Sequence, residues 1–129
     1  MKDVSGVHEI EEKITSILQR VAGEVNLYTL ALITREGRRI AYYSTTDVDA
    51  DLMSAVVAAI LNAAEMAITQ MRQGELWEIV VRGSEGFSIV SCAGTSFLMV
   101  GAGTHSADLG RVVAVMRDYS KMIAQILGI

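Results

Sequence analysis

The chain has 129 residues, of which 51% are hydrophobic and only 20% charged, and this composition excludes a disordered or nucleic-acid-wrapping tail. The length fits one hydrophobic core, so residues 1–129 are predicted to form a single domain. A net charge of −4 and a pI near 5.1 argue against nucleic-acid binding, which requires a concentrated basic surface.

The cysteine content and the N-terminal segment do not indicate export or membrane insertion. Cys92 is the only cysteine and has no partner for an internal disulfide. The acidic residues Asp3, Glu9, Glu11 and Glu12 distinguish the N-terminal segment from signal and transit peptides. The longest uncharged stretches contain too few apolar residues for a membrane span. We therefore expect a cytoplasmic protein without direct membrane insertion.

A helix and a β-hairpin are the first predicted elements. Residues 7–23 place apolar side chains at helical spacing with charged residues between them, which predicts an amphipathic helix. Residues 27–34 and 39–44 are β-rich and flank a short turn that contains glycine, which predicts a hairpin. The basic residues of this hairpin are Arg35, Arg38 and Arg39. They could contact an anionic partner, although charged hairpin tips commonly serve solubility alone.

A long helix is predicted from about Asp49 to Arg72. One continuous apolar stripe is expected to face the core and comprises Met53, Val56, Val57, Ile60, Ala64, Ala67, Ile68 and Met71. The opposite face also lacks charge over most of its length and carries Ala55, Ala58, Ala59, Asn62 and Met66. A helix that is apolar on both faces is usually covered on both, and small residues permit a second helix to approach closely. Alanine-rich faces are also simply good helix formers.

Three strands and a final helix complete the predicted order. Residues 76–83 alternate as a strand does, residues 87–93 and 97–103 form two more strands, and a helix starts near 106–108. The order α-β-β-α-β-β-β-α predicts an α/β (α+β) protein built as a three-layer α-β-α sandwich. We expect a five-stranded, mostly antiparallel sheet with the central helix on one face and the other two helices on the opposite face.

The sequence contains no pattern that indicates an active site. Residues 101–103 (GAG) lack the third glycine of a dinucleotide-binding loop, and close packing of the strand explains them better. Cys92, His8 and His105 are too few for a structural metal site. A Cys92–His105 nucleophile pair would require adjacent strand ends, whereas the strand alternation favours a buried, inert thiol. We therefore expect no enzyme activity, no cofactor and no metal.

Three large aromatic residues are candidates for surface contacts. Tyr42 and Tyr43 are adjacent on one strand and must point to opposite faces of the sheet. Trp77 is the only tryptophan. It fits a subunit interface, where large aromatics commonly contribute most of the binding energy, and it fits the core of the monomer equally well.

The order of elements and several segments resemble the Roadblock family (dynein light chain Roadblock type). The resemblance extends from about Glu9 to Leu127. It is carried by LALITREGRRIAYYS in the hairpin, SAVVAAILNAAEMAI in the long helix, SIVSCAG in a later strand and FLMVGAGTHSADLGRV leading into the last helix. These are patterns and not catalytic signatures, and they imply a Roadblock/profilin-like fold.

The resemblance implies a non-enzymatic scaffold that forms a homodimer, or a heterodimer with a related Roadblock protein. The strand at 76–82 would pair with its mate, and the helix at 49–72 would pack beside its mate. The resemblance also implies a Ras-like small GTPase as partner, or a dynein-associated role. The compact chain is closer to the prokaryotic GTPase-regulator branch, some members of which promote GTP hydrolysis. The predicted dimer or partner interface comprises Ala55, Ala59, Asn62, Met66, Leu76, Trp77, Glu78 and Val80.

A small-ligand sensor of PAS or profilin-like architecture is the alternative from another class. Such a domain needs a cavity with a few converging polar groups. The sequence offers only Thr29, Ser88 and Ser91 for this purpose, so the sensor ranks second to the GTPase regulator.

Overall fold

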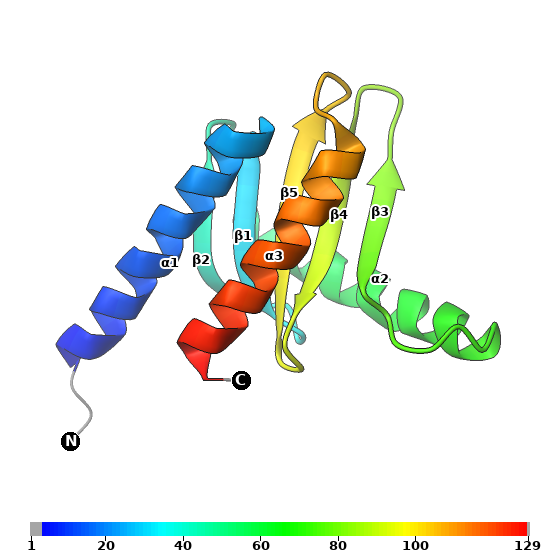
Figure 1. Ribbon diagram of the computed structural model, residues 1–129, viewed down its shortest axis with the longest axis horizontal. Helices are drawn as coiled ribbons and strands as arrows, with labels where there is room; N and C mark the ends of the chain where they lie inside the picture. The colour runs from blue at the N-terminus through cyan, green and yellow to red at the C-terminus, as the bar shows by residue number, and fades with distance from the viewer. Residues whose placement is uncertain (1–3, 129) are drawn as a thin grey trace.

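The computed structural model describes residues 4–128 and contains the elements in the predicted order. In chain order they are α1 (Val4–Val25), β1 (Thr29–Thr34), β2 (Arg39–Ser44), α2 (Ala50–Gln70), β3 (Glu78–Arg82), β4 (Gly86–Ala93), β5 (Phe97–Thr104) and α3 (Leu109–Leu127). The strands form one antiparallel sheet in the order β2-β1-β5-β4-β3. α1 and α3 cover one face and α2 lies behind the other (Figure 1), which confirms the predicted three-layer sandwich.

Local sequence accounts for where α2 and α3 begin. The carboxylate of Asp49 accepts a hydrogen bond from the amide of Leu52 at 3.1 Å. Asp108 caps α3 in the same way, by accepting from the amide of Arg111 at 3.3 Å. These caps satisfy amides that have no partner within the helix. The first helix is longer than predicted at both ends.

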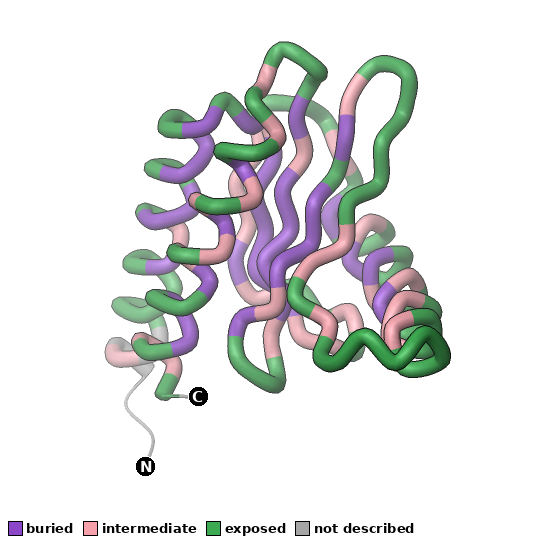
Figure 2. The backbone as a smooth tube through the Cα atoms, turned by 45° about the vertical axis from the view of Figure 1, so that its right-hand side comes forward, coloured by how far each residue is buried: buried purple, intermediate pink, exposed green. Residues whose placement is uncertain are grey.

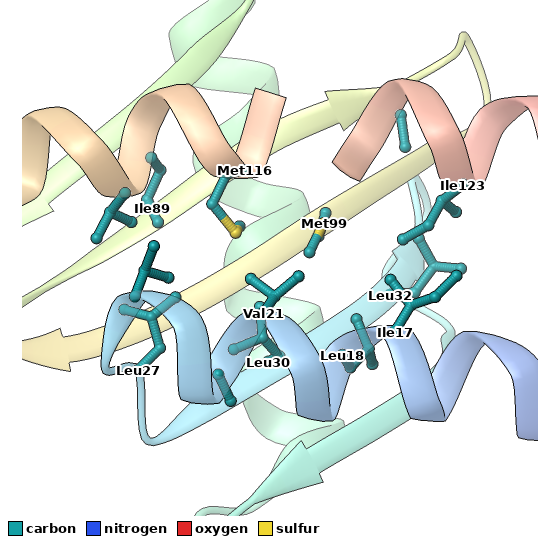
Figure 3. Packing of buried hydrophobic residues seen from close by; sticks show 14 of the residues in the cluster. Ile17, Leu18, Val21, Leu27, Leu30, Leu32, Ile89, Met99, Met116 and Ile123 are labelled. Carbon is teal, nitrogen blue, oxygen red and sulfur yellow. The ribbon is translucent and has the colours of Figure 1, made fainter. Parts of the chain in front are cut away.

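Two hydrophobic clusters join the layers. The larger lies between the sheet and the α1–α3 layer and includes Leu18, Val21, Leu30, Ile89, Met99, Met116 and Ile123 (Figure 3). The smaller lies between the sheet and α2 and consists of Ala31, Ile33, Val57, Leu61, Val90, Leu98 and Val100. Tyr42 packs against the smaller cluster and Tyr43 against the larger, as predicted for adjacent residues of one strand.

Two glycines of β5 make room for a buried leucine. A Cβ at Gly101 or at Gly103 would lie 2.9 Å from a methyl carbon of Leu27. Leu27 is buried in the larger cluster, where side chains pack too tightly to admit another carbon. Residues 101–103 therefore serve close packing, in agreement with the structural interpretation of the GAG segment.

The molecule has one open side. β3 is the last strand of the sheet, and the C-terminal half of α2 runs past it (Figures 1 and 2). The outer turns of α2, much of β3 and the β3–β4 turn are exposed (Figure 2). The start of α1 and the end of α3 lie near each other on the side away from β3 (Figure 1).

Candidate interaction surface

α2 packs on the sheet through a narrow face. Its buried residues are Ala50, Ser54, Val57 and Leu61. The predicted core-facing stripe is therefore partly wrong, because Val56, Ala67 and Met71 are exposed. α2 is apolar around most of its circumference, so helical periodicity alone could not show which part of it meets the sheet.

The β1–β2 turn packs closely against α2 at Ser54. Gly37 in this turn has a φ of 94°, and a Cβ there would lie 3.0 Å from the carbonyl oxygen of Ser54. The hydroxyl of Ser54 donates to the carbonyl of Ala50 at 2.7 Å. Burying a hydroxyl that has a hydrogen-bond partner costs little free energy. Ser54 can therefore lie on the face that contacts the sheet, while the larger apolar residues Leu52 and Val56 are exposed.

Two arginines of the first hairpin fasten it to α2. Arg35 forms an ion pair with Glu65, and the Nε of Arg39 lies 3.6 Å from the Oδ1 of Asp51. Arg38 is exposed and forms no ion pair within residues 4–128. Arg35 and Arg39 thus connect the hairpin to the second layer, and Arg38 does not.

The outward side of α2 is an uncharged, largely apolar surface, which we call the α2 face. Leu52, Val56 and Met66 expose 62%, 50% and 68% of their surface, and exposed alanines lie between them. Ala55, Ala59, Asn62 and Met66 of the predicted interface all lie here. The α2 face consists of Leu52, Ala55, Val56, Ala59, Asn62, Ala63 and Met66.

By length and composition, α2 is also apolar enough to cross a membrane. Its most apolar 18-residue window has a mean hydropathy of 1.7 and is 22% buried. The number of apolar residues in the uncharged stretches of the sequence did not predict a helix that is apolar enough to cross a membrane. Withdrawal of α2 would expose the smaller cluster, including Ile33, Val90 and Leu98, so hydrophobic burial favours a helix that stays on the sheet.

β3 is an open edge strand next to α2. It pairs with β4 on one side, and its other edge is not paired within residues 4–128. Val80 and Val81 are exposed, and Trp77 exposes 64% of its surface, so the indole does not belong to the monomer's core. Leu76 differs from the rest of the predicted interface, because it packs against the smaller cluster.

A side chain of α3 holds Glu78 of β3 in position. The Nη2 of Arg117 donates to the Oε1 of Glu78 at 2.7 Å, and the guanidinium carbon lies 5.2 Å from the centre of the Trp77 ring, within cation–π range. The Nε of Arg117 is buried and has no hydrogen-bond partner within residues 4–128. Sequence reasoning missed Arg117, because no short-range pattern connects it with a residue 39 positions earlier.

Two shallow hollows flank the segment that joins α2 to β3. One, of about 480 Å³, is lined in part by Arg35, Glu65 and Cys92. The other, of about 420 Å³, is lined in part by Trp77 and Arg117. Each is open to solvent, and the first contains the Arg35–Glu65 ion pair, so neither resembles an enclosed ligand site.

The three hydroxyls proposed for a ligand sensor do not converge. Thr29 is buried, and its Oγ1 lies 2.8 Å from the Oγ of Ser44. Ser88 lines a hollow at the β3–β4 turn, whereas Ser91 lines the hollow beside Trp77. The sensor alternative therefore gains no support from the geometry.

Cys92 and His105 are far apart, contrary to the geometry that a nucleophile pair needs. Cys92 pairs with Leu98 near the start of β5, while His105 follows the other end of that strand, roughly 23 Å away at the usual rise of a strand. Burial raises the pKa of the Cys92 thiol, which is typical of an inert cysteine. Within residues 4–128, no cluster of three His, Cys, Asp or Glu residues could hold a metal.

The sequence over residues 13–102 matches the Roadblock/LC7 domain. The chain belongs to the Roadblock/LC7 family. No curated protein sequence matches this Roadblock protein.

Solved structures share its fold. A structure described as MglB with tetrameric arrangement has a TM-score of 0.86 at 20% identity, over 98% of this chain and 92% of that chain. The gliding protein MglB from Thermus thermophilus gives 0.85 at 21% identity, over 98% and 93%. Profilin II from Acanthamoeba castellanii gives 0.57 at 17% identity, over 86% and 97%. These likenesses confirm the predicted Roadblock/profilin-like fold.

Proposed function

We propose that this Roadblock/LC7 protein is a dimeric, non-enzymatic scaffold that binds a Ras-like small GTPase and modulates its activity or localisation. One observation carries the proposal: the apolar α2 face lies beside the open edge of β3. Soluble monomers rarely expose large contiguous apolar surfaces, and such surfaces usually mark protein interfaces. A second copy of the chain that covers both the α2 face and the edge of β3 would explain why both are exposed in the monomer.

The α2 face is complementary to a second copy of itself. Leu52, Val56, Ala59, Ala63 and Met66 recur at alternating steps of four and three, the spacing of a seam between two helices. The bulky residues lie at the two ends of the seam and the alanines at its centre. If two copies of α2 pack antiparallel about Ala59, Leu52 of each copy meets Met66 of the other, and the backbones approach closely at the alanines.

The GTPase partner is proposed from family membership, and a regulatory role is in keeping with structural neighbours that include a gliding protein. A dimer has two equivalent sets of exposed loops around one two-fold axis, so it offers a partner a broader platform than the monomer. We include in the proposal that the dimer acts in the cytoplasm and that α2 packs against protein and does not enter a bilayer.

Two measurements test the proposal. Light scattering across a concentration series should give the mass of a dimer, and a monomer at micromolar concentration would contradict it. The Ras-like GTPases of the source organism, purified and loaded with GDP or a non-hydrolysable GTP analogue, should then be titrated with the dimer in a calorimeter. At least one should bind with a nucleotide-dependent affinity. Absence of binding to all of them would overturn the GTPase assignment and leave the dimer intact.

Flotation with anionic vesicles separates a protein interface from a membrane contact. The dimer should remain with the soluble fraction, because its α2 face is already covered. Co-flotation of the wild-type protein would show that the α2 face binds lipid, and the proposal of a protein-covered helix would be wrong.

A further inference from the structure

The side of β3 that faces the α1–α3 layer is not covered by a helix. Side chains alternate along a strand, and Glu78 contacts Arg117 of α3, so Glu78, Val80 and Arg82 point to this side of the sheet. α3 lies over β4 and β5 and stops short of β3 (Figure 1). Val80 is therefore 39% exposed, and Arg82 is exposed as well.

A hollow at the start of β3 brings an aromatic ring and two cations together. The hollow of about 420 Å³ is lined in part by Trp77, Arg117 and Lys121. Trp77 exposes 64% of its surface, and the guanidinium carbon of Arg117 lies 5.2 Å from the centre of its ring. Lys121 follows Arg117 by about one turn of α3. We call the residues of this side of the molecule the α3–β3 surface, which consists of Trp77, Val80, Arg82, Arg117 and Lys121.

The positive charge of the α3–β3 surface is only partly neutralised within the chain. Arg82 and Lys121 are exposed and form no ion pair among residues 4–128. Arg117 pairs with Glu78, but its Nε has no hydrogen-bond partner among the same residues, so one of its donors is unused. Of the described residues that line the hollow, Glu75 alone is acidic. The surface therefore has cations to offer to an anionic partner.

We propose that the α3–β3 surface binds a short acidic segment of a partner protein, which places an apolar side chain against Trp77 and carboxylates at Arg82 and Lys121. Tryptophan and arginine commonly contribute most of the binding energy of an interface, and a group of cations selects a partner of opposite charge. Trp77 and Arg82 lie roughly 17 Å apart at the usual rise of a strand, so about five residues of an extended segment reach from one to the other.

The chemistry of the surface favours a protein segment over other anions. A hollow that is open to solvent does not enclose a small ligand, and the apolar surface of Trp77 and Val80 suits side chains better than phosphate groups. The net charge of −4 opposes nucleic acids and anionic membranes, which bind to concentrated basic surfaces. The α3–β3 surface and the α2 face lie on opposite sides of the sheet (Figure 1). A segment bound here would therefore not compete with the contact proposed for α2, and the inference does not require the dimer.

Trp77 reports directly on this surface, because it is the only tryptophan of the chain. A display library of random peptides, each about 12 residues long, is selected on the wild-type protein with the Arg82→Glu, Lys121→Glu double variant as competitor. The enriched peptides should carry a net negative charge and a large apolar residue. Titration of an enriched peptide should shift the Trp77 emission to shorter wavelength, because the peptide removes the ring from water. Arg82→Glu and Lys121→Glu should each raise the dissociation constant of the peptide at least about fivefold.

The control and the competing occupants keep the test decisive. Arg20→Glu, at an exposed position of α1, is the matched charge reversal and should bind the peptide like wild type. Enrichment of neutral or basic peptides, or equal binding by the double variant, would overturn the proposal. An emission shift with phosphatidylglycerol vesicles and not with peptides would show a lipid contact instead. Assemblies larger than a dimer that Lys121→Glu breaks up, measured by light scattering, would show that another copy of the chain occupies the surface.

Discussion

Arg117 of α3 and Glu78 of β3 are joined by a hydrogen bond of 2.7 Å between Nη2 and Oε1. It connects the last helix to the last strand of the sheet, which has a neighbour on one side only among residues 4–128. The same guanidinium lies over the exposed ring of Trp77. One arginine therefore fixes both the first residue of β3 and the aromatic residue before it.

Arg117→Met should destabilise the fold, because it removes the charged partner of Glu78 and the cation over Trp77. The groups are partly exposed, so we expect a loss of about 1 kcal/mol in the free energy of unfolding. Urea unfolding followed by circular dichroism measures it. Lys121→Met, one turn further along α3 at an exposed position, is the control and should change the stability little. Equal effects of both changes would contradict the role given to Arg117.

Gly101→Ala should destabilise the protein by about 1–2 kcal/mol, because the new methyl group overlaps Leu27. The partner can be removed to show the cause. On a Leu27→Ala background, which is itself destabilised by the loss of a buried side chain, the same glycine substitution should cost less. A double-mutant cycle of unfolding free energies measures this coupling. Strictly additive losses would show that the two sites do not meet.

Ala59→Glu should convert the dimer to monomer while leaving the fold intact. Ala59 is exposed on the α2 face, so the glutamate meets water in the monomer but would be buried without a partner in the dimer. Light scattering reports the mass and circular dichroism the fold. Thr69→Glu introduces the same charge at an exposed position of α2 outside the α2 face and should leave the mass unchanged. A dimeric Ala59→Glu protein would exclude the α2 face from the interface.

Proline should distinguish the two edges of β3. The amide of Cys92 donates to the carbonyl of Trp77 and the amide of Gly83 to the carbonyl of Gly86, so the odd-numbered residues of β3 bond β4. Val80→Pro therefore removes an amide that points to the open edge, where proline is tolerated, and should abolish dimerisation without unfolding the monomer. Ile79→Pro removes an amide that points to β4 and should destabilise the sheet itself. Size-exclusion chromatography and thermal unfolding separate the two results. An undisturbed dimer with proline at position 80 would show that β3 does not pair across the interface.

Cys92 should alkylate slowly near neutral pH. Burial raises the pKa of its thiol, so less of the reactive thiolate is present than in a free cysteine, and the rate should rise only at higher pH. Iodoacetamide labelling followed by mass spectrometry measures the rate across pH. The unfolded protein in concentrated urea is the control and should react faster. Cys92 is only partly buried, and equal rates in the folded and unfolded protein would contradict the raised pKa of its thiol.

The sequence predicts the fold better than it predicts the contacts. Local alternation and turn residues place β2 at Arg39–Ser44, as observed, and acidic caps locate the starts of α2 and α3. These features depend on neighbours a few residues apart. The face that α2 presents to the sheet includes Ser54, which lies against Gly37 of the β1–β2 turn. Periodicity within α2 does not contain this long-range contact.

The same contrast between local sequence features and long-range contacts applies to the candidate interface. Absence of charge marks Ala55, Ala59, Asn62 and Met66, and all four are exposed on α2. Leu76 is predicted to belong to the same interface, but it precedes β3 and is partly buried against the smaller cluster. Pairing along a strand edge depends on which amides the neighbouring strand uses, and that information exists only once the sheet order is known.

The position of the helix ends has a practical consequence for experiments in cells. α1 begins and α3 ends on the side away from β3 (Figure 1). A fluorescent protein or an affinity label fused at either end would therefore stand clear of both the α2 face and the strand edge. Labelled and unlabelled copies could then be mixed, and energy transfer between two differently coloured fusions would follow subunit exchange without hindering it.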